Sequence, residues 1–150
     1  MCFAQRNPTI AMHSLCWCVL AFTFLVVVAT LTLILPYARL RQRRESASTR
    51  KSLTLESWVA AYYPEYGDRI EVIRVVLKTY SEVYGIAIEK VRPDDALYEN
   101  YGYLNQLVLD DSAPTFLGGV EARLRRESSI GWRPGETLRT VDDVIRSILR

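Results

Sequence analysis

The sequence predicts an all-α protein in which a single N-terminal transmembrane helix precedes a small helical bundle. Residues 15–35 contain no charged side chain. Farther along the chain, apolar residues recur at steps of three and four, the spacing of a buried helix face, and no convincing run alternates as a strand would. A chain of 150 residues allows one modest domain plus an appendage.

The apolar stretch LCWCVLAFTFLVVVATLTLIL is long enough to cross a bilayer, because a helix of this length spans about 31 Å. We expect a tail over residues 1–14 and a transmembrane helix over residues 15–36. Trp17 and Tyr37 fit interfacial positions, and Pro36 should end or bend the helix. A cleaved signal peptide is the alternative, but its apolar core is usually shorter and is not followed by arginines.

The charges on the two sides of this stretch are unequal. Only Arg6 and the α-amino group precede it, whereas six bases and only Glu45 follow within residues 39–51. This asymmetry predicts a single-pass membrane protein with a cytoplasmic C-terminal domain. We expect residues 37–52 to form a flexible, basic juxtamembrane linker that favours anionic membrane lipid. A nucleic-acid-binding arm is the alternative, but the domain offers no basic stripe with interleaved aromatic residues, so we expect no nucleic-acid partner.

Several chemistries are disfavoured by the positions of cysteine and histidine. Cys2, Cys16 and Cys18 all precede the domain, as does the single histidine, His13. The domain therefore lacks the residues for a Ser-His-Asp or Cys-His arrangement or for a zinc site with histidine. The segment GWRPGET also lacks the phosphate-binding loop pattern. We expect no metal and no enzymatic activity.

The first half of the domain, which covers residues 53–150, predicts two helices. A short one over LESWVAAYY is capped by Thr54 or Ser52 and closed by Pro64 and Gly67. The second extends over about residues 70–84, with Gly85 just past its end. The segment YGIAIEKV that follows is compatible with a strand or with a loop.

The second half predicts two more helices. One begins near Ser112 and runs through FLGGVEARLRRE, although Gly118 and Gly119 each cost about 1 kcal/mol relative to alanine. The last is TVDDVIRSIL, in which Thr140 and Asp143 have the spacing of a capping box.

The order of IEKVRPDDALYE, LDDSA and TVDDVIRSIL resembles that of an acyl carrier protein over about residues 70–150. In that family a D-S-L motif heads the second helix, and its serine receives phosphopantetheine. The resemblance places Asp111, Ser112 and Ala113 at this motif. It implies an acyl-carrier-like helical bundle with a cofactor-binding position at Ser112 and Asp111.

The chain also departs from the family pattern. Ala113 replaces the leucine, Pro114 follows it, and residues 100–106 resemble an insertion. In acyl carrier proteins, the corresponding helix is acidic and docks onto basic enzyme surfaces. In this chain, which resembles them, the helix after Ser112 instead carries Arg123, Arg125 and Arg126.

Ser112 therefore has two interpretations. Either it carries 4'-phosphopantetheine, or Asp111 or Ser112 only caps the helix, and we favour the cap. The pairs Asp94–Asp95, Asp110–Asp111 and Asp142–Asp143 are likewise expected to lie at helix starts rather than to form catalytic dyads.

Aromatic residues also have two interpretations. Tyr98, Tyr101 and Tyr103 could dock a partner or close the core, while Trp58, Tyr62 and Trp132 should pack in the core.

These observations predict a membrane-anchored, non-enzymatic module without a cofactor, which binds membrane lipid and a cytoplasmic or membrane protein partner. The alternative is a working carrier tethered near membrane lipid or envelope synthesis. The sequence leaves open the acyl cargo, the partner, the oligomeric state and the start at Met1 or Met12.

Overall fold

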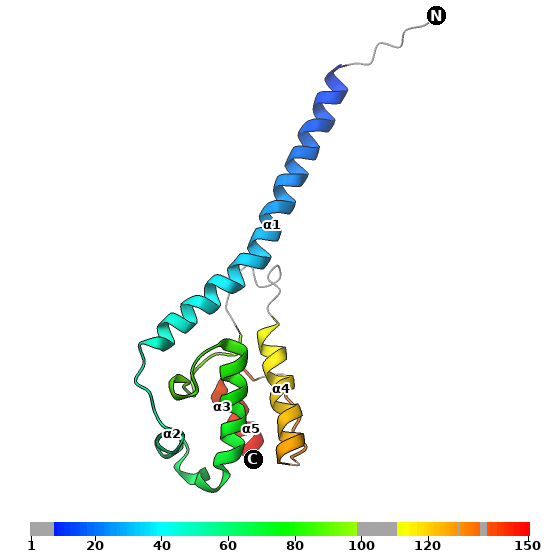
Figure 1. Cartoon of the computed structure of the whole chain (residues 1–150). Coiled ribbons are helices and arrows are strands. Elements are labelled where there is room, and N and C mark those ends of the chain that lie inside the picture. The colour runs from blue at the N-terminus through cyan, green and yellow to red at the C-terminus, as the bar shows by residue number, and fades with distance from the viewer. Residues whose placement is uncertain (1–7, 99–110, 129, 136–137) are drawn as a thin grey trace, which may run out of the picture.

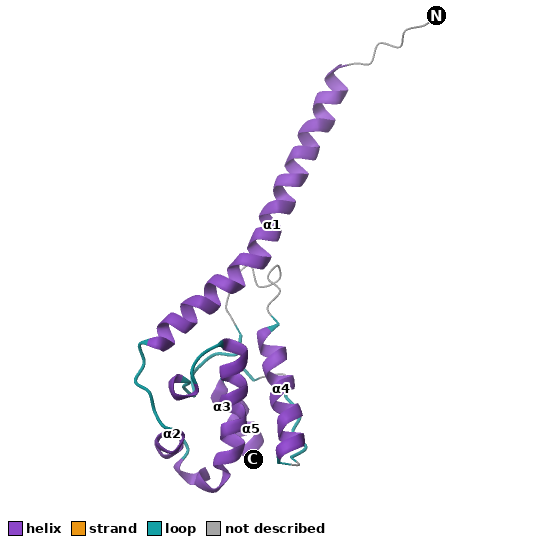
Figure 2. Ribbon diagram, in the orientation of Figure 1, coloured by secondary structure: helices purple, strands orange, loops and turns teal. Residues whose placement is uncertain are grey.

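The computed structural model describes residues 8–98, 111–128, 130–135 and 138–150. Over these residues it contains helices and loops and no strand, with one isolated bridge between Ala96 and Thr140 (Figure 2). The all-α prediction is confirmed. The elements are α1 (Pro8–Ser48), α2 (Leu55–Tyr62), the 3-10 helix η1 (Pro64–Arg69), α3 (Ile70–Tyr84), the 3-10 helix η2 (Ile88–Lys90), α4 (Ser112–Glu127) and α5 (Val141–Leu149).

Helix α1 is one continuous helix that projects far beyond the bundle (Figure 1). Pro36 lies inside α1, not at its end. Since proline cannot donate a hydrogen bond to the carbonyl one turn earlier, it accounts for the change of direction between the upper and lower parts of the ribbon. We call residues 19–35 the apolar half of α1 and residues 37–48 its basic half.

The expectation of a flexible linker over residues 37–52 is wrong for the basic half, which is helical to Ser48. Ala47 is buried and Leu40 is partly buried against the core of the bundle. These two side chains are seven residues apart and therefore lie on the same face of the helix. Tertiary contacts along this face hold the segment helical and fix it to the bundle.

Helices α2 and α3 follow the sequence prediction. The Thr54 hydroxyl accepts a hydrogen bond from the N–H of Ser57 at 3.3 Å and caps α2. Helix α3 ends at Gly85, whose φ of 66° lies in the left-handed region that glycine adopts readily. Beyond Gly85 the chain forms a loop and η2, with Ile86 buried, so the loop interpretation of YGIAIEKV is correct.

Helix α3 packs mainly against α4 and also contacts α2 and α5. Gly119 permits close packing of α3 and α4, because a Cβ there would lie 2.9 Å from Cγ2 of Thr79. Gly118 faces open space and has no such role. The capping box of Thr140 and Asp143 at the start of α5 is present as predicted.

The core contains most of the aromatic residues that the sequence assigned to it. Trp58 and Trp132 are both buried, and their indole N–H groups donate to the carbonyl of Val91 at 2.8 Å and to Oγ of Ser147 at 3.0 Å. Tyr62 differs from the prediction, because it is 37% exposed while its ring packs 5.1 Å from that of Trp58.

Candidate functional site

The arginines expected in a flexible linker lie against the bundle instead. Nη1 of Arg43 donates to the carbonyl of Ala96 at 2.8 Å and to the Tyr80 hydroxyl at 3.4 Å. Its guanidinium also lies 5.0 Å from the centre of the Tyr84 ring, within the range of a cation–π contact. Burial raises the pKa of Tyr80, although the charge of Arg43 acts to lower it. The Tyr80 hydroxyl therefore stays protonated and donates to the carbonyl of Ala96.

Arg44 binds the C-terminal end of α3. Its Nε donates to the carbonyl of Tyr84 at 2.7 Å, where the last carbonyls of the helix have no partner within the helix. A cation at this end also interacts favourably with the helix dipole. A Cβ at Gly85 would lie 2.5 Å from the Arg44 guanidinium. Gly85 therefore both ends α3 and leaves room for Arg44.

Arg50, two residues past α1, forms an ion pair with Asp95 at 2.7 Å. Asp95 is only 6% exposed, and its Oδ2 also accepts the backbone N–H of Arg92 at 2.8 Å. Arg50 further donates to the carbonyl of Lys90 at 3.1 Å. No helix starts at Asp94–Asp95 itself, and Asp95 neutralises a base contributed by a distant segment. The residues in which a helix just after this pair was expected lie partly outside the described residues.

These contacts bring three parts of the fold together at residues 91–98. Lys90 and Arg92 donate in return to the carbonyls of Ser48 and Lys51. On its other side this segment bonds to the start of α5, since the N–H of Val141 donates to the carbonyl of Asp95 at 3.0 Å. We call Arg43, Arg44, Arg50 and Asp95 the arginine clamp. It joins α1 to the end of α3 and, through residues 91–98, to α5.

A second polar cluster links Tyr63, which lies between α2 and η1, to α5. The Tyr63 hydroxyl donates to Oδ1 of Asp142, and Nε of Arg146 contacts both oxygens of the same carboxylate at 2.8 Å. Burial first, and then the hydrogen bond to Asp142, raise the pKa of Tyr63. Asp142 and Asp143 therefore lie at a helix start, as the sequence predicted, and both are used to hold α5.

Ser112 is the first residue of α4 and is half-buried. The first turn of α4 lies at the end of the bundle nearer to the upper part of α1 (Figure 1). Asp111 occupies the N-cap position, but its side chain makes no capping hydrogen bond, because its backbone angles of −90° and 6° are not those of an extended cap. Capping by the Asp111 side chain is therefore a wrong expectation. Asp110, Tyr101 and Tyr103 fall outside the described residues.

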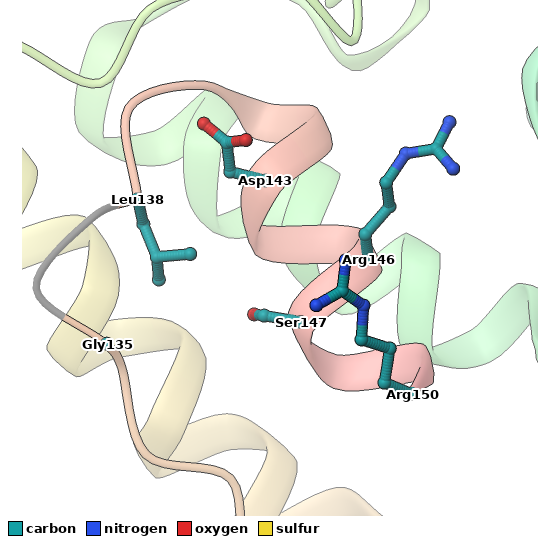
Figure 3. Close-up of a pocket in the computed structure, with 6 residues that line it drawn as sticks. All are labelled: Gly135, Leu138, Asp143, Arg146, Ser147 and Arg150. Carbon is teal, nitrogen blue, oxygen red and sulfur yellow. The ribbon is translucent and has the colours of Figure 1, made fainter.

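Two pockets of about 320 Å³ each occur on the described surface. One, shown in Figure 3, is lined by Gly135, Leu138, Asp143, Arg146, Ser147 and Arg150. Its polar groups already hold the fold, since Asp143 closes the capping box, Arg146 binds Asp142 and Ser147 accepts from Trp132. Desolvation, the largest single contribution, acts to raise the pKa of Asp143, but hydrogen bonds with the backbone of Arg139 and with the side chain and backbone of Thr140 together lower it.

Sequence reasoning missed the arginine clamp, although one signal was present. The spacing of one helix face is shared by Leu40, Arg43, Arg44 and Ala47. Because two of these four residues are arginines, the sequence gives only a weak indication that this face is buried. No group of His, Cys, Asp and Glu suited to a metal occurs among the described residues. Comparison with protein-family models, curated proteins and solved structures gives no match to this chain.

Proposed function

We propose that the chain is a membrane-anchored helical module that acts without catalysis, by presenting its bundle to a cytoplasmic or membrane protein partner. The observation that carries this proposal is the division of α1. Its apolar half stands free of the bundle, whereas its basic half is fixed to the bundle by the arginine clamp.

The apolar half exposes large side chains that water would solvate poorly. Phe22 and Phe24 are each 71% exposed, and most of their apolar neighbours are similarly uncovered. A contiguous apolar surface of this size favours a lipid environment or a partner. One helix of the described chain is long and apolar enough to cross a bilayer, and none of its most apolar window is buried inside the protein.

The polar groups in this half are already satisfied within the helix. The only polar side chains over residues 19–35 are Thr23, Thr30 and Thr32. Their hydroxyls donate to backbone carbonyls one turn earlier at 2.7, 2.7 and 3.0 Å. Because an unpaired hydroxyl is costly in hydrocarbon, this arrangement supports placing the segment in lipid.

The bundle offers surfaces for a protein partner. Tyr98 is 49% exposed, and Arg125 and Arg126 are exposed near the end of α4. Tyrosine and arginine are enriched where proteins bind one another. The chemistry of the pocket in Figure 3 supports binding over catalysis, because its carboxylate, Asp143, and its hydroxyl, Ser147, are engaged in holding α5.

Fractionation and a topology reporter test the anchor. The full chain should stay with membranes after alkaline extraction, and a reporter fused after Arg150 should be active only when it can function in the cytoplasm. Release at high pH would contradict the anchor. A reporter active only outside the cytoplasm would reverse the orientation that Arg39 and Arg41 favour.

The carrier alternative rests on the position of Ser112 at the start of α4. Intact mass of protein from its native host would test it, together with Ser112→Ala. A phosphopantetheine-sized adduct that disappears in this variant would establish the carrier. We expect unmodified protein, because Ala113 is buried, Pro114 stiffens the first turn and the second half of α4 is basic.

A further inference from the structure

We propose that the bundle rests on the membrane surface through one defined face, which takes anionic phospholipid headgroups as its partner. This inference rests on the membrane anchor proposed above and adds an orientation to it. The face is the end of the bundle nearest the apolar half of α1, and it contains Tyr37, Arg39 and Arg41 from the first residues of α1 after Pro36, together with Tyr98 of the bundle. We call these four residues the headgroup face.

The first argument is the position of the clamp along α1. Arg43 follows Pro36 by seven residues, which corresponds to about 10 Å along a helix. The headgroup layer beyond the hydrocarbon core is about 5 to 8 Å thick on each side. The point at which α1 is fixed to the bundle therefore lies just outside the headgroup layer.

The second argument is the division of the bases in, and just after, the basic half of α1. Arg43 and Arg44 bind bundle carbonyls, and Arg50 is paired with Asp95. Arg39 and Arg41 are exposed, and Arg41 pairs with the exposed Glu45 on the same helix. The outward bases nearest the apolar half thus lie where lipid phosphates would be.

The third argument is the position of exposed tyrosine. Tyr37 is the first residue after Pro36 and is exposed, and Tyr98 is two residues past the carbonyl that Arg43 binds. Tyrosine favours the membrane interface because its ring is apolar and its hydroxyl is polar. Asp111 is exposed at the start of α4, so anionic lipid should approach the α1 side of this end and avoid the α4 side.

Spin-label depth measurements on the full chain in lipid nanodiscs test this orientation. Cys2, Cys16 and Cys18 would first be replaced by alanine, and single labels placed by Phe24→Cys, Tyr98→Cys or Tyr62→Cys. Tyr62 is the matched control, since it is an exposed tyrosine on α2, toward the far end of the bundle (Figure 1). Both leaflets of a nanodisc have the same lipid, so the direction of insertion does not affect the result.

In nanodiscs that contain phosphatidylglycerol, we expect the label at position 98 to collide less with a water-soluble nickel complex than the label at 62. Without lipid contact the order would be reversed, because Tyr98 is the more exposed of the two. Joint replacement Arg39→Gln and Arg41→Gln should lower the ratio of docked to undocked bundle about fivefold per arginine. Lys51→Gln, which removes an exposed base outside the headgroup face, should leave the ratio unchanged.

The label at position 24 separates the two proposals. Position 24 could be accessible to oxygen but not to nickel, while position 98 collides more with nickel than position 62 does. In that case the anchor stands and the headgroup face is overturned. If position 24 is as accessible to nickel as position 62, both proposals are overturned. Equal shielding of position 98 in phosphatidylcholine and phosphatidylglycerol nanodiscs would overturn the anionic partner.

Discussion

The two halves of α1 form one helix but depend on different surroundings. The apolar half makes its hydrogen bonds entirely within itself, down to the hydroxyls of Thr23 and Thr30. The basic half is tied to other parts of the chain, since Arg43 and Arg44 donate to carbonyls more than 35 residues away. A segment suited to lipid is locally complete, whereas a segment in water acquires a fixed position through tertiary contacts.

This difference assigns a separate role to each half. Disrupting the apolar half should release the protein from membranes without unfolding the bundle. Disrupting the contacts of the basic half should destabilise the bundle without releasing the protein. Variants in the two halves, and in the bundle beyond them, test this separation.

The largest effect is expected for charges in the apolar half. In the double variant Phe24→Arg and Leu25→Arg, each arginine near the centre of the span should cost about 3 kcal/mol of insertion free energy. The protein should move from the alkali-resistant membrane fraction to the soluble or aggregated fraction. Phe24→Leu is the control and should stay with membranes. Retention of the double variant would mean that this half is not the anchor.

A smaller but still large effect is expected at the ion pair of the clamp. Arg50→Ala leaves the carboxylate of Asp95 buried without its cation, which should lower the free energy of unfolding by about 3 kcal/mol. Lys51→Ala, an exposed neighbour, should change it by less than about 0.5 kcal/mol. Denaturant unfolding of both variants in detergent, followed by circular dichroism, measures the difference. Equal midpoints would show that Arg50 does not stabilise the bundle.

Replacing two glycines with alanine should change the free energy of unfolding in opposite directions. Gly85→Ala should destabilise the bundle by about 1 to 2 kcal/mol, because φ is positive there, and it also displaces Arg44. Gly118→Ala should stabilise it by up to about 1 kcal/mol, since the position is helical and open. Thermal unfolding measures both. A neutral Gly85→Ala would mean that Arg44 and the end of α3 adjust without cost.

The smallest expected effect is on stability at low pH, and it involves α5 rather than the arginine clamp. Because the folded-state pKa of Asp143 lies below the ordinary value of 3.8, the carboxylate stabilises the fold above that value. The contribution, at most about 1 kcal/mol for such a cap, should be lost as the pH falls through the folded-state pKa. Asp143→Asn should remove this part of the pH dependence of the unfolding midpoint. An unchanged acid profile would exclude Asp143 as its source.

Local sequence patterns determined much of this protein. Four features depend only on residues that lie close together in the sequence. They are the charge-free stretch, the Thr54 cap, the end of α3 at Gly85 and the capping box of Thr140 with Asp143. Their physical causes are hydrogen bonding within one turn, backbone sterics and helical periodicity. These features could be predicted without knowing what the helices pack against.

Tertiary structure alone decided the roles of the charged residues. In the sequence, Arg39 and Arg43 are equivalent members of one basic cluster, and Asp95 resembles any acid of a helix start. The acceptors of Arg43, Arg44 and Arg50 lie 37 to 53 residues away, at carbonyls, a hydroxyl and a carboxylate of other segments. No local pattern encodes such partners, because a guanidinium binds any suitably placed oxygen and only the folded chain fixes where the oxygens are.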